Sequence, residues 1–123
     1  MKIALIAHDG KKAEMVAFIN KNKDLLHEAE LVATGTTGNH IEQAGFTVRK
    51  LMSGPIGGDA QIGALVAEKQ LHGVLFLRDP LDKHPHEPDI LMLMRLCDVH
   101  DIPLATNPAT ARLLLEGMRM DQS

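Results

Sequence analysis

The sequence predicts a doubly wound α/β fold, in which a five-stranded and mostly parallel sheet carries helices on both faces. Short apolar runs of strand length alternate along the chain with segments whose apolar residues recur at helical spacing. Most of the apolar runs end in glycine, hydroxyl or ionisable residues, which is typical of the loops that follow parallel strands. No repeat, linker or low-complexity segment interrupts this pattern. We therefore expect one domain over residues 1–123.

The first half of the chain supplies three of the expected strands. Its opening apolar run at 3–7 is continuous, which suits a central strand that is buried on both faces. Met15, Phe18 and Ile19 follow at helical spacing and mark the inner face of a helix. In order, the expected elements are a strand at 3–7, a helix to about residue 22, a strand at 31–33, a glycine- and threonine-rich loop at 34–38, a short helix at 39–44 and a strand at 46–52.

The second half begins with a helix whose apolar residues follow Asp59 at helical spacing. The apolar run at 73–77 is again continuous and predicts a buried strand. Asn107 and Pro108 combine a helix cap with a proline suited to the first helical position, so they mark the start of the last helix. In order, the expected elements are a helix at 59–70, a strand at 73–77 that ends in residues 78–81, a proline-rich loop that contains His84, Pro85, His86 and Pro88, a helix from Asp89 to near residue 100, a strand at 102–105, a helix at 109–118 and a frayed tail at 121–123.

Composition and charge indicate a soluble domain with an aliphatic core. Hydrophobic residues make up 45% of the chain, yet it contains only three Phe and no Trp or Tyr. A net charge of -3 and a pI near 6.1 argue against a nucleic-acid partner, which usually requires a basic surface. The single cysteine, Cys97, lies in an apolar run, so we expect a buried thiol in a reducing cytoplasm. No segment is long enough to span a membrane, and we expect no membrane partner.

Ionisable and hydroxyl residues collect at one edge of the predicted sheet. They follow the strands, and in an open parallel sheet ligands bind in the crevice outside the carboxyl ends of the strands. Turn and cap residues also gather there in any such fold, so each residue taken alone has a structural explanation. The loops carry, in chain order, His8, Asp9 and Lys12; Thr34, Gly35, Thr36 and Thr37; Ser53, Gly54 and Asp59; Asp79, His84, His86 and Asp89; and Thr106 and Asn107.

The stretch Ser53-Gly54-Pro55-Ile56-Gly57-Gly58-Asp59 combines three glycines with a carboxylate at a predicted helix start. Glycines let main-chain N–H groups approach an anion closely, and the helix N-terminus adds a favourable dipole. Asp59 would then lie beside the anion, where it can act as a base. The alternative is that Asp59 caps the helix after a flexible loop, since Asp is a common N-cap residue.

Several known site types have no motif in this sequence. It contains neither Gly-x-Gly-x-x-Gly nor Gly-x-x-x-x-Gly-Lys-Ser/Thr, and it lacks the Gly-x-Ser-x-Gly nucleophile elbow. His84 and His86 have acidic residues nearby, but their spacing fits no helix-borne pair of metal ligands. What remains is a small phosphorylated ligand bound by Lys12 and the glycine loops, with carboxylates beside it that indicate catalysis.

Six motifs carry a resemblance when they are taken in this order: Ala7-His8-Asp9 with Lys12, Thr34-Gly35-Thr36-Thr37-Gly38, Ser53-Gly54-Pro55-Ile56-Gly57-Gly58-Asp59, Asp79-Pro80-Leu81, Pro85-His86-Glu87-Pro88-Asp89 and Ala105-Thr106-Asn107. Together they resemble the methylglyoxal synthase family over almost the whole chain. The resemblance implies a lyase that converts dihydroxyacetone phosphate into methylglyoxal and inorganic phosphate through an enediolate, in a glycolytic bypass. It also implies a cytoplasmic homohexamer that needs neither a metal nor an organic cofactor. Inorganic phosphate, as the product, is expected to inhibit.

The resemblance also implies a role for each residue at this edge of the sheet. Asp59 matches the catalytic base, which removes a proton from the hydroxymethyl carbon beside the carbonyl. His86 would donate to the oxygens on which negative charge develops, and Asp89 or Asp9 would return the proton or orient His86. Asp9 and Asp79 match supporting acids. The implied substrate-binding residues are His8, Lys12, Thr34, Gly35, Thr36, Thr37, Ser53, Gly54 and His86.

Two other functions are compatible with these residues. A ligand-sensing domain of the same fold would bind a phosphate or nucleotide without turnover, although the acidic residues beside the anion site argue against it. A metal-dependent phosphatase would lose its activity to chelators. An assay of the metal-free protein with dihydroxyacetone phosphate separates the three functions.

Overall fold

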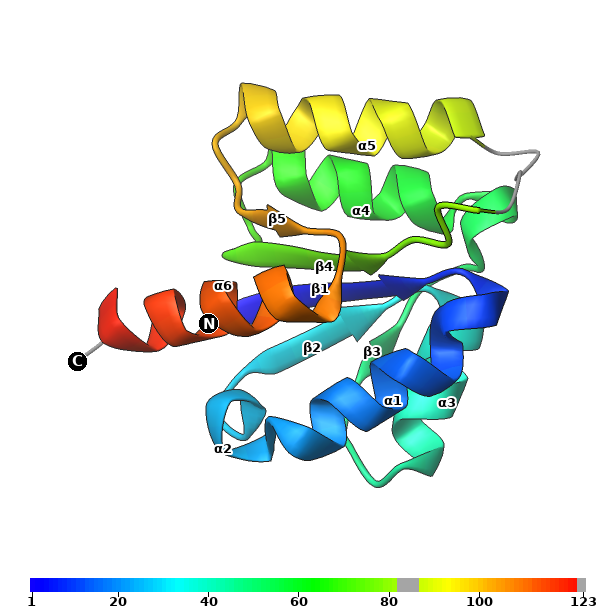
Figure 1. Ribbon diagram of the computed structural model, residues 1–123. Coiled ribbons are helices and arrows are strands. Elements are labelled where there is room, and N and C mark those ends of the chain that lie inside the picture. The colour runs from blue at the N-terminus through cyan, green and yellow to red at the C-terminus, as the bar shows by residue number, and fades with distance from the viewer. Residues whose placement is uncertain (82–86, 122–123) are drawn as a thin grey trace.

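The computed structural model describes residues 1–81 and 87–121, and a five-stranded sheet lies at its centre (Figure 1). The strands are β1 (Lys2–Ala7), β2 (Glu30–Ala33), β3 (Arg49–Lys50), β4 (Gly73–Leu77) and β5 (Leu104–Ala105). They lie in the order β3-β2-β1-β4-β5, and each pair of neighbours is parallel. The predicted doubly wound α/β fold is confirmed. Because the order reverses between β1 and β4, the ligand crevice is expected at the carboxyl ends of these two strands.

Helices cover both faces of the sheet. They are α1 (Lys12–Lys21), α2 (Lys23–Leu26), α3 (Gly35–Gln43), α4 (Gly58–Ala67), α5 (Glu87–Val99) and α6 (Pro108–Asp121), with short 3₁₀ turns η1 (Asp9–Lys11) and η2 (Gly54–Ile56). Figure 1 shows α4 and α5 on one side of the sheet and α1, α3 and α6 on the other. Alternate residues of β1 therefore enter different hydrophobic clusters: Ile3 and Leu5 pack on the α1 side, and Ala4 and Ile6 on the α4 side. Cys97 is buried in the second cluster, as expected.

Residues 35–38 of the glycine- and threonine-rich segment are helical, so the prediction of a loop over 34–38 is wrong. Helix α3 begins at Gly35, with Thr34 at its N-cap position. A Cβ on Gly35 would lie 3.0 Å from the Leu51 carbonyl oxygen, and one on Gly38 would lie 2.6 Å from the Lys50 side chain. The two glycines thus let the helix start pack tightly against the end of β3. This packing outweighs the low helix propensity of Gly and Thr.

The third strand is shorter than the predicted 46–52 and comprises Arg49 and Lys50 alone. It lies at the edge of the sheet and pairs only with β2, where Val32 and Ala33 are its partners. The chain remains attached to β2 beyond the strand, because the Leu51 N–H donates to the Ala33 carbonyl at 2.8 Å. The opposite edge strand, β5, is likewise shorter than predicted. Edge strands have only one neighbour to pair with, and a hydrophobic pattern alone does not indicate how far that pairing extends.

The remaining boundaries differ from the prediction by a few residues. The chain passes through η1 before α1 begins, and the sequence pattern does not indicate the four-residue α2. Helix α4 ends earlier than predicted, and Lys69 with a left-handed φ of 56° follows it. Helix α6 begins at Pro108, as predicted, and Asn107 Oδ1 accepts a hydrogen bond from the Thr110 N–H at 2.9 Å. It continues to Asp121, where a frayed tail was expected. None of the described helices is long and apolar enough to cross a membrane.

Candidate active site

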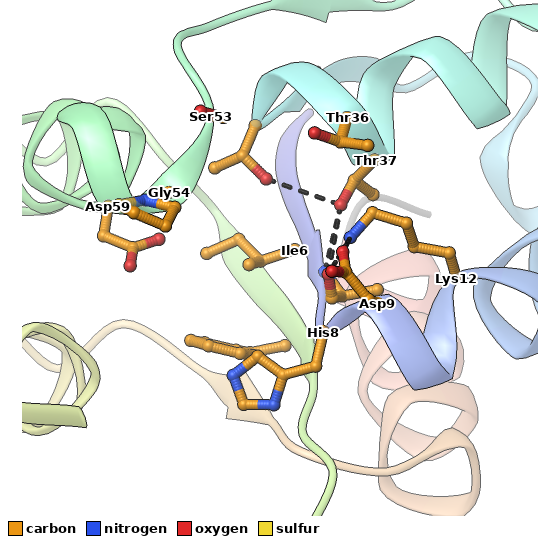
Figure 2. A pocket seen from close by; sticks show the side chains of 13 residues that line it. Ile6, His8, Asp9, Lys12, Thr36, Thr37, Ser53, Gly54 and Asp59 are labelled. Carbon is orange, nitrogen blue, oxygen red and sulfur yellow. Dashed lines mark hydrogen bonds and ion pairs between the residues drawn. The ribbon is translucent and has the colours of Figure 1, made fainter. Parts of the chain in front are cut away.

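A cavity of about 110 Å³ opens at the predicted edge of the sheet, beside the carboxyl end of β1 (Figure 2). A cavity of on the order of 10–15 Å³ can hold one water molecule, so this cavity has room for a small metabolite. Figure 2 shows Asp59 and Lys12 on opposite sides, with the His8 ring lying between them along a third side. The lining residues are Ile6, Ala7, His8, Asp9, Lys12, Thr34, Thr36, Thr37, Ser53, Gly54, Pro55, Asp59 and Phe76. The structure therefore brings together most of the residues that the sequence singled out.

Lys12 provides the positive charge of the cavity. It is the first residue of α1 and is only 8% exposed, because its side chain folds back toward the end of β1. The ammonium donates to the Ala7 carbonyl oxygen at 3.0 Å and to Asp9 Oδ1 at 2.6 Å. The Asp9 side chain is exposed to solvent, so water screens its attraction for Lys12. An ammonium has three N–H donors, so beyond these two contacts within the described residues a third N–H can bind an anion in the cavity.

Thr37 joins the start of α3 to the end of β1. Its hydroxyl accepts a hydrogen bond from the Ala7 N–H at 3.2 Å and lies 3.4 Å from the Ala7 carbonyl oxygen, to which it donates. Thr34 and Thr37 are both buried, and their hydroxyls are 3.4 Å apart. The result is a helix N-terminus fixed at the cavity wall. The first N–H groups of a helix have no partner within it, so this end of α3 can bind an anion.

Asp59 lies in the first turn of α4 and is 2% exposed. Gly57, with a φ of 125°, occupies the N-cap position, so the alternative in which Asp59 caps the helix is wrong. Gly54 packs directly on the Asp59 side chain, since a Cβ on Gly54 would lie 3.1 and 3.3 Å from the two carboxylate oxygens. Gly58 is still more tightly constrained, because a Cβ at this position would lie 2.0 Å from the Met52 carbonyl oxygen. The glycines of this stretch thus fix a buried carboxylate at the cavity.

His8 connects the ends of β1 and β4. Its main-chain N–H donates to the Leu77 carbonyl at 3.1 Å, and its ring Nδ1 accepts the main-chain N–H of Asp79 at 3.0 Å. The ring stands edge-on to Phe76, with centroids 5.2 Å apart and an interplanar angle of 81°. His8 is buried and held on two sides. Because it follows β1 and contacts the end of β4, His8 lies at the point where the strand order reverses.

Two of the expected site residues that the structure describes, Gly35 and Asp79, do not line the cavity. Gly35 packs against the main chain at 51–53, where it supports the start of α3. The Asp79 carboxylate accepts a hydrogen bond from the Leu81 N–H at 3.2 Å, and its second oxygen would lie 3.0 Å from a Cβ on Gly10. Asp79 therefore shapes the loop after β4 and presents its main-chain N–H to His8.

His86, to which the resemblance assigns a catalytic role, lies outside the described residues, as does His84. Asp89 belongs to the first part of α5, and only its main chain is described. Within residues 1–81 and 87–121, no group of three or more His, Cys, Asp or Glu side chains is placed to hold a metal ion.

Ile6, Pro55 and Phe76 also line the cavity, although no feature of the sequence assigns them a role in the site. Ile6 and Phe76 are neighbours across β1 and β4 and face the α4 side of the sheet. Side chains alternate between the two faces of a strand, so the sequence would show that Ile6 and Phe76 share a face once the two strands were known to be adjacent. The sequence does not show that adjacency.

Comparison with known proteins agrees with the fold. The family model described as the MGS-like domain matches residues 14–106, which places the chain among proteins with that α/β domain. The chain is 57% identical over 120 residues to the methylglyoxal synthase of Moorella thermoacetica, covering 97% of this chain and 94% of the relative. It is 60% identical over 119 residues to the methylglyoxal synthase of Bacillus velezensis, covering 96% and 87%.

A solved structure extends this similarity to three dimensions. The crystal structure of methylglyoxal synthase from Elizabethkingia anophelis NUHP1 matches with a TM-score of 0.88 and 43% sequence identity, over 93% of this chain and 76% of that chain. The chain belongs to the methylglyoxal synthase family. The resemblance noted in the sequence is thereby confirmed, as is the expectation of an enzyme of this kind.

Proposed function

We propose that the protein converts dihydroxyacetone phosphate into methylglyoxal and inorganic phosphate, with Asp59 as the general base. The observation that carries this proposal is the placement of a buried carboxylate and a buried ammonium on opposite sides of one small cavity (Figure 2). A substrate with a phosphate at one end and an acidic C–H at the other suits this arrangement. Its phosphate binds beside Lys12, and its hydroxymethyl carbon lies beside Asp59.

The phosphate subsite comprises Lys12, the start of α3 and the main chain at Ser53 and Gly54. The ammonium supplies a charge-assisted hydrogen bond, and Thr36 and Thr37 belong to the first turn of a helix whose positive dipole end faces the cavity. No carboxylate needs to touch the phosphate in this orientation, because Asp59 lies across the cavity and Asp9 is paired with Lys12.

The reaction begins when Asp59 takes a proton from the hydroxymethyl carbon, and the electron pair of the C–H bond becomes the double bond of an enediolate. The C–O bond to phosphate then breaks, and its electron pair leaves with the phosphate. The enol that remains takes up a proton at its CH₂ carbon and becomes methylglyoxal. For the second step the C–O bond must overlap the enediolate π system, so the direction of the phosphate decides between elimination and return to a triose phosphate.

His86 is proposed to donate to the enediolate oxygens, where a well-placed donor contributes on the order of 3 kcal/mol to the transition state. Asp89 or Asp9 is proposed to return the proton or to orient His86. The contact with Lys12 gives Asp9 a second role, that of holding the ammonium at the cavity. Inhibition by inorganic phosphate follows, because the product fits the subsite from which it leaves.

The wider setting of this proposal comes from the family. We propose a cytoplasmic homohexamer that acts in a glycolytic bypass without a metal or an organic cofactor, and a single domain at 1–123. Exposed apolar side chains on the outer face of α5, Leu91 and Val99, are compatible with contacts between subunits.

The test is an assay of both products, methylglyoxal and phosphate, with dihydroxyacetone phosphate and chelator-treated enzyme. Wild type is expected to release the two in equal amounts, whereas Asp59→Asn should bind a substrate analogue yet lose activity by orders of magnitude. Glyceraldehyde 3-phosphate is measured alongside, since its formation would indicate that the intermediate returns without elimination. Binding of the analogue without release of either product would show a sensor. Phosphate release by the untreated protein that chelator treatment abolishes would show a metal-dependent phosphatase.

A further inference from the structure

The contact between His8 and the main chain of Asp79 determines where the imidazole carries its proton. The Asp79 N–H lies 3.0 Å from His8 Nδ1. A main-chain N–H is only a donor, so Nδ1 must accept, and a nitrogen that accepts carries no proton of its own. In a neutral imidazole the proton is then on Nε2. A doubly protonated ring would set two N–H groups against each other and break this contact.

The surroundings of both partners hold this contact in place. The edge-on packing against Phe76 fixes the plane of the His8 ring. The Asp79 carboxylate, bonded to the Leu81 N–H and packed over Gly10, fixes the direction of the Asp79 N–H. The ring lines the cavity and is 6% exposed. Figure 2 shows one of its nitrogens on the side of the cavity where Asp59 lies.

We propose that the main-chain amide of Asp79 is a positioning group that keeps His8 neutral with its proton on Nε2, so that His8 serves the bound ligand as a neutral hydrogen-bond donor. The ligand class is an oxygen-rich phosphorylated metabolite, and in this respect the inference rests on the proposed function. His8 acts neither as a cation for the phosphate nor as a base. The loop after β4 thereby sets the chemistry of a residue that follows β1.

The proton position is measured directly by ¹⁵N NMR of histidine-labelled protein, without ligand and with inorganic phosphate. The His8 signals are assigned by their loss in His8→Gln. We expect Nδ1 to show the shift of an unprotonated nitrogen and Nε2 that of an N–H nitrogen at neutral pH. A proton on Nδ1, or on both nitrogens, overturns the proposal. Asp79→Asn keeps the main-chain N–H and should keep this signature; its loss in that variant would make the carboxylate the determinant and would also overturn the proposal.

Two substitutions separate the donor from the contact that holds it. His8→Asn retains an acceptor near the Nδ1 position but has nothing at Nε2, whereas His8→Gln places an amide N–H near Nε2 without the acceptor. We expect His8→Asn to lower kcat/KM and analogue affinity roughly ten- to a hundred-fold, the range for a lost buried hydrogen bond. His8→Gln should stay within about tenfold of wild type, with a lower Tm. The opposite ranking would mean that His8 only supports the loop, and two unaffected variants would mean that neither nitrogen matters; either outcome overturns the proposal.

Failure of this inference can be distinguished from failure of the proposed function. The NMR signature and the affinity for inorganic phosphate need no turnover. If wild type released no methylglyoxal but showed the Nε2 proton and the predicted ranking in analogue affinity, the role of His8 would stand and the reaction would be wrong. If wild type converted dihydroxyacetone phosphate while the His8 ring carried its proton on Nδ1, the proposed reaction would stand and the role proposed for His8 would be wrong.

Discussion

Gly54 lies so close to the Asp59 carboxylate that a single methyl group on Gly54 would come within 3.1 and 3.3 Å of its two oxygens. The loop and the proposed base therefore occupy complementary positions. The absence of a side chain at 54 is what allows the carboxylate to lie where it does.

Gly54→Ala is expected to displace the Asp59 carboxylate and to lower kcat by about tenfold or more, since small errors in placing a base are costly. The fold should persist, because the carboxylate can turn away. Steady-state kinetics and a thermal melt measure the two effects. Gly117→Ala is the matched control: nothing lies within 4 Å of its Cβ position in α6, so Tm should rise slightly and activity should not change. Full activity in Gly54→Ala would contradict the tight fit.

Lys12→Met is expected to weaken the binding of inorganic phosphate at least about tenfold, because it removes the buried ammonium at the cavity. Isothermal titration at two salt concentrations measures the loss. Lys11→Met is the control, since the neighbouring Lys11 pairs with Glu14 at 3.2 Å and does not line the cavity. Equal losses in the two variants would indicate a general effect of surface charge instead of a phosphate subsite.

Thr37→Val should destabilise the protein by about 1–3 kcal/mol. Valine keeps the shape of threonine but leaves the main-chain N–H of Ala7 without the side-chain acceptor that it has in the wild type. Thr37→Ser keeps the hydroxyl and should lose much less. Urea denaturation gives both free energies of unfolding. A valine variant no less stable than the serine variant would contradict the role given to the hydroxyl in joining α3 to β1.

Burial, assisted by the neighbouring Asp98 charge, raises the pKa of Cys97 from 9.0 to about 11. Between these values the unfolded chain releases the thiol proton while the folded protein retains it. The free energy of unfolding should therefore fall as the pH rises through this window, and the contribution should disappear in Cys97→Ala. At neutral pH a thiol reagent should modify Cys97 only after denaturation. Rapid labelling of the folded protein would contradict the burial.

The sequence predicts the centre of the sheet better than its edges. Strands β1 and β4 are buried on both faces, so continuous apolar runs identify them almost to the residue. The start of α3 could not be predicted in this way. Gly35 and Gly38 have low helix propensity, and only their packing against the segment at 50–51 explains a helix there.

The same distinction applies to the site. Residues that follow parallel strands were expected at one edge, and His8, Lys12 and Asp59 do line one cavity there. The contact between His8 and Asp79 could not be predicted, because it depends on β1 and β4 being neighbours. Alternation of strands and helices predicts a parallel sheet, but it does not specify the order of the strands.

The strand order β3-β2-β1-β4-β5 has a consequence for the chain as it leaves the ribosome. Strand β1 is synthesised first but lies in the middle of the sheet, so one of its edges stays open until β4 has emerged. Until then the His8 ring has no Asp79 N–H from which to accept a hydrogen bond. The main-chain pairing of β1 with β4 is also missing. The cavity can therefore be complete only after β4 has been synthesised, and a shortened chain that ends before β4 would carry Lys12 and Asp59 without a finished site to hold a ligand.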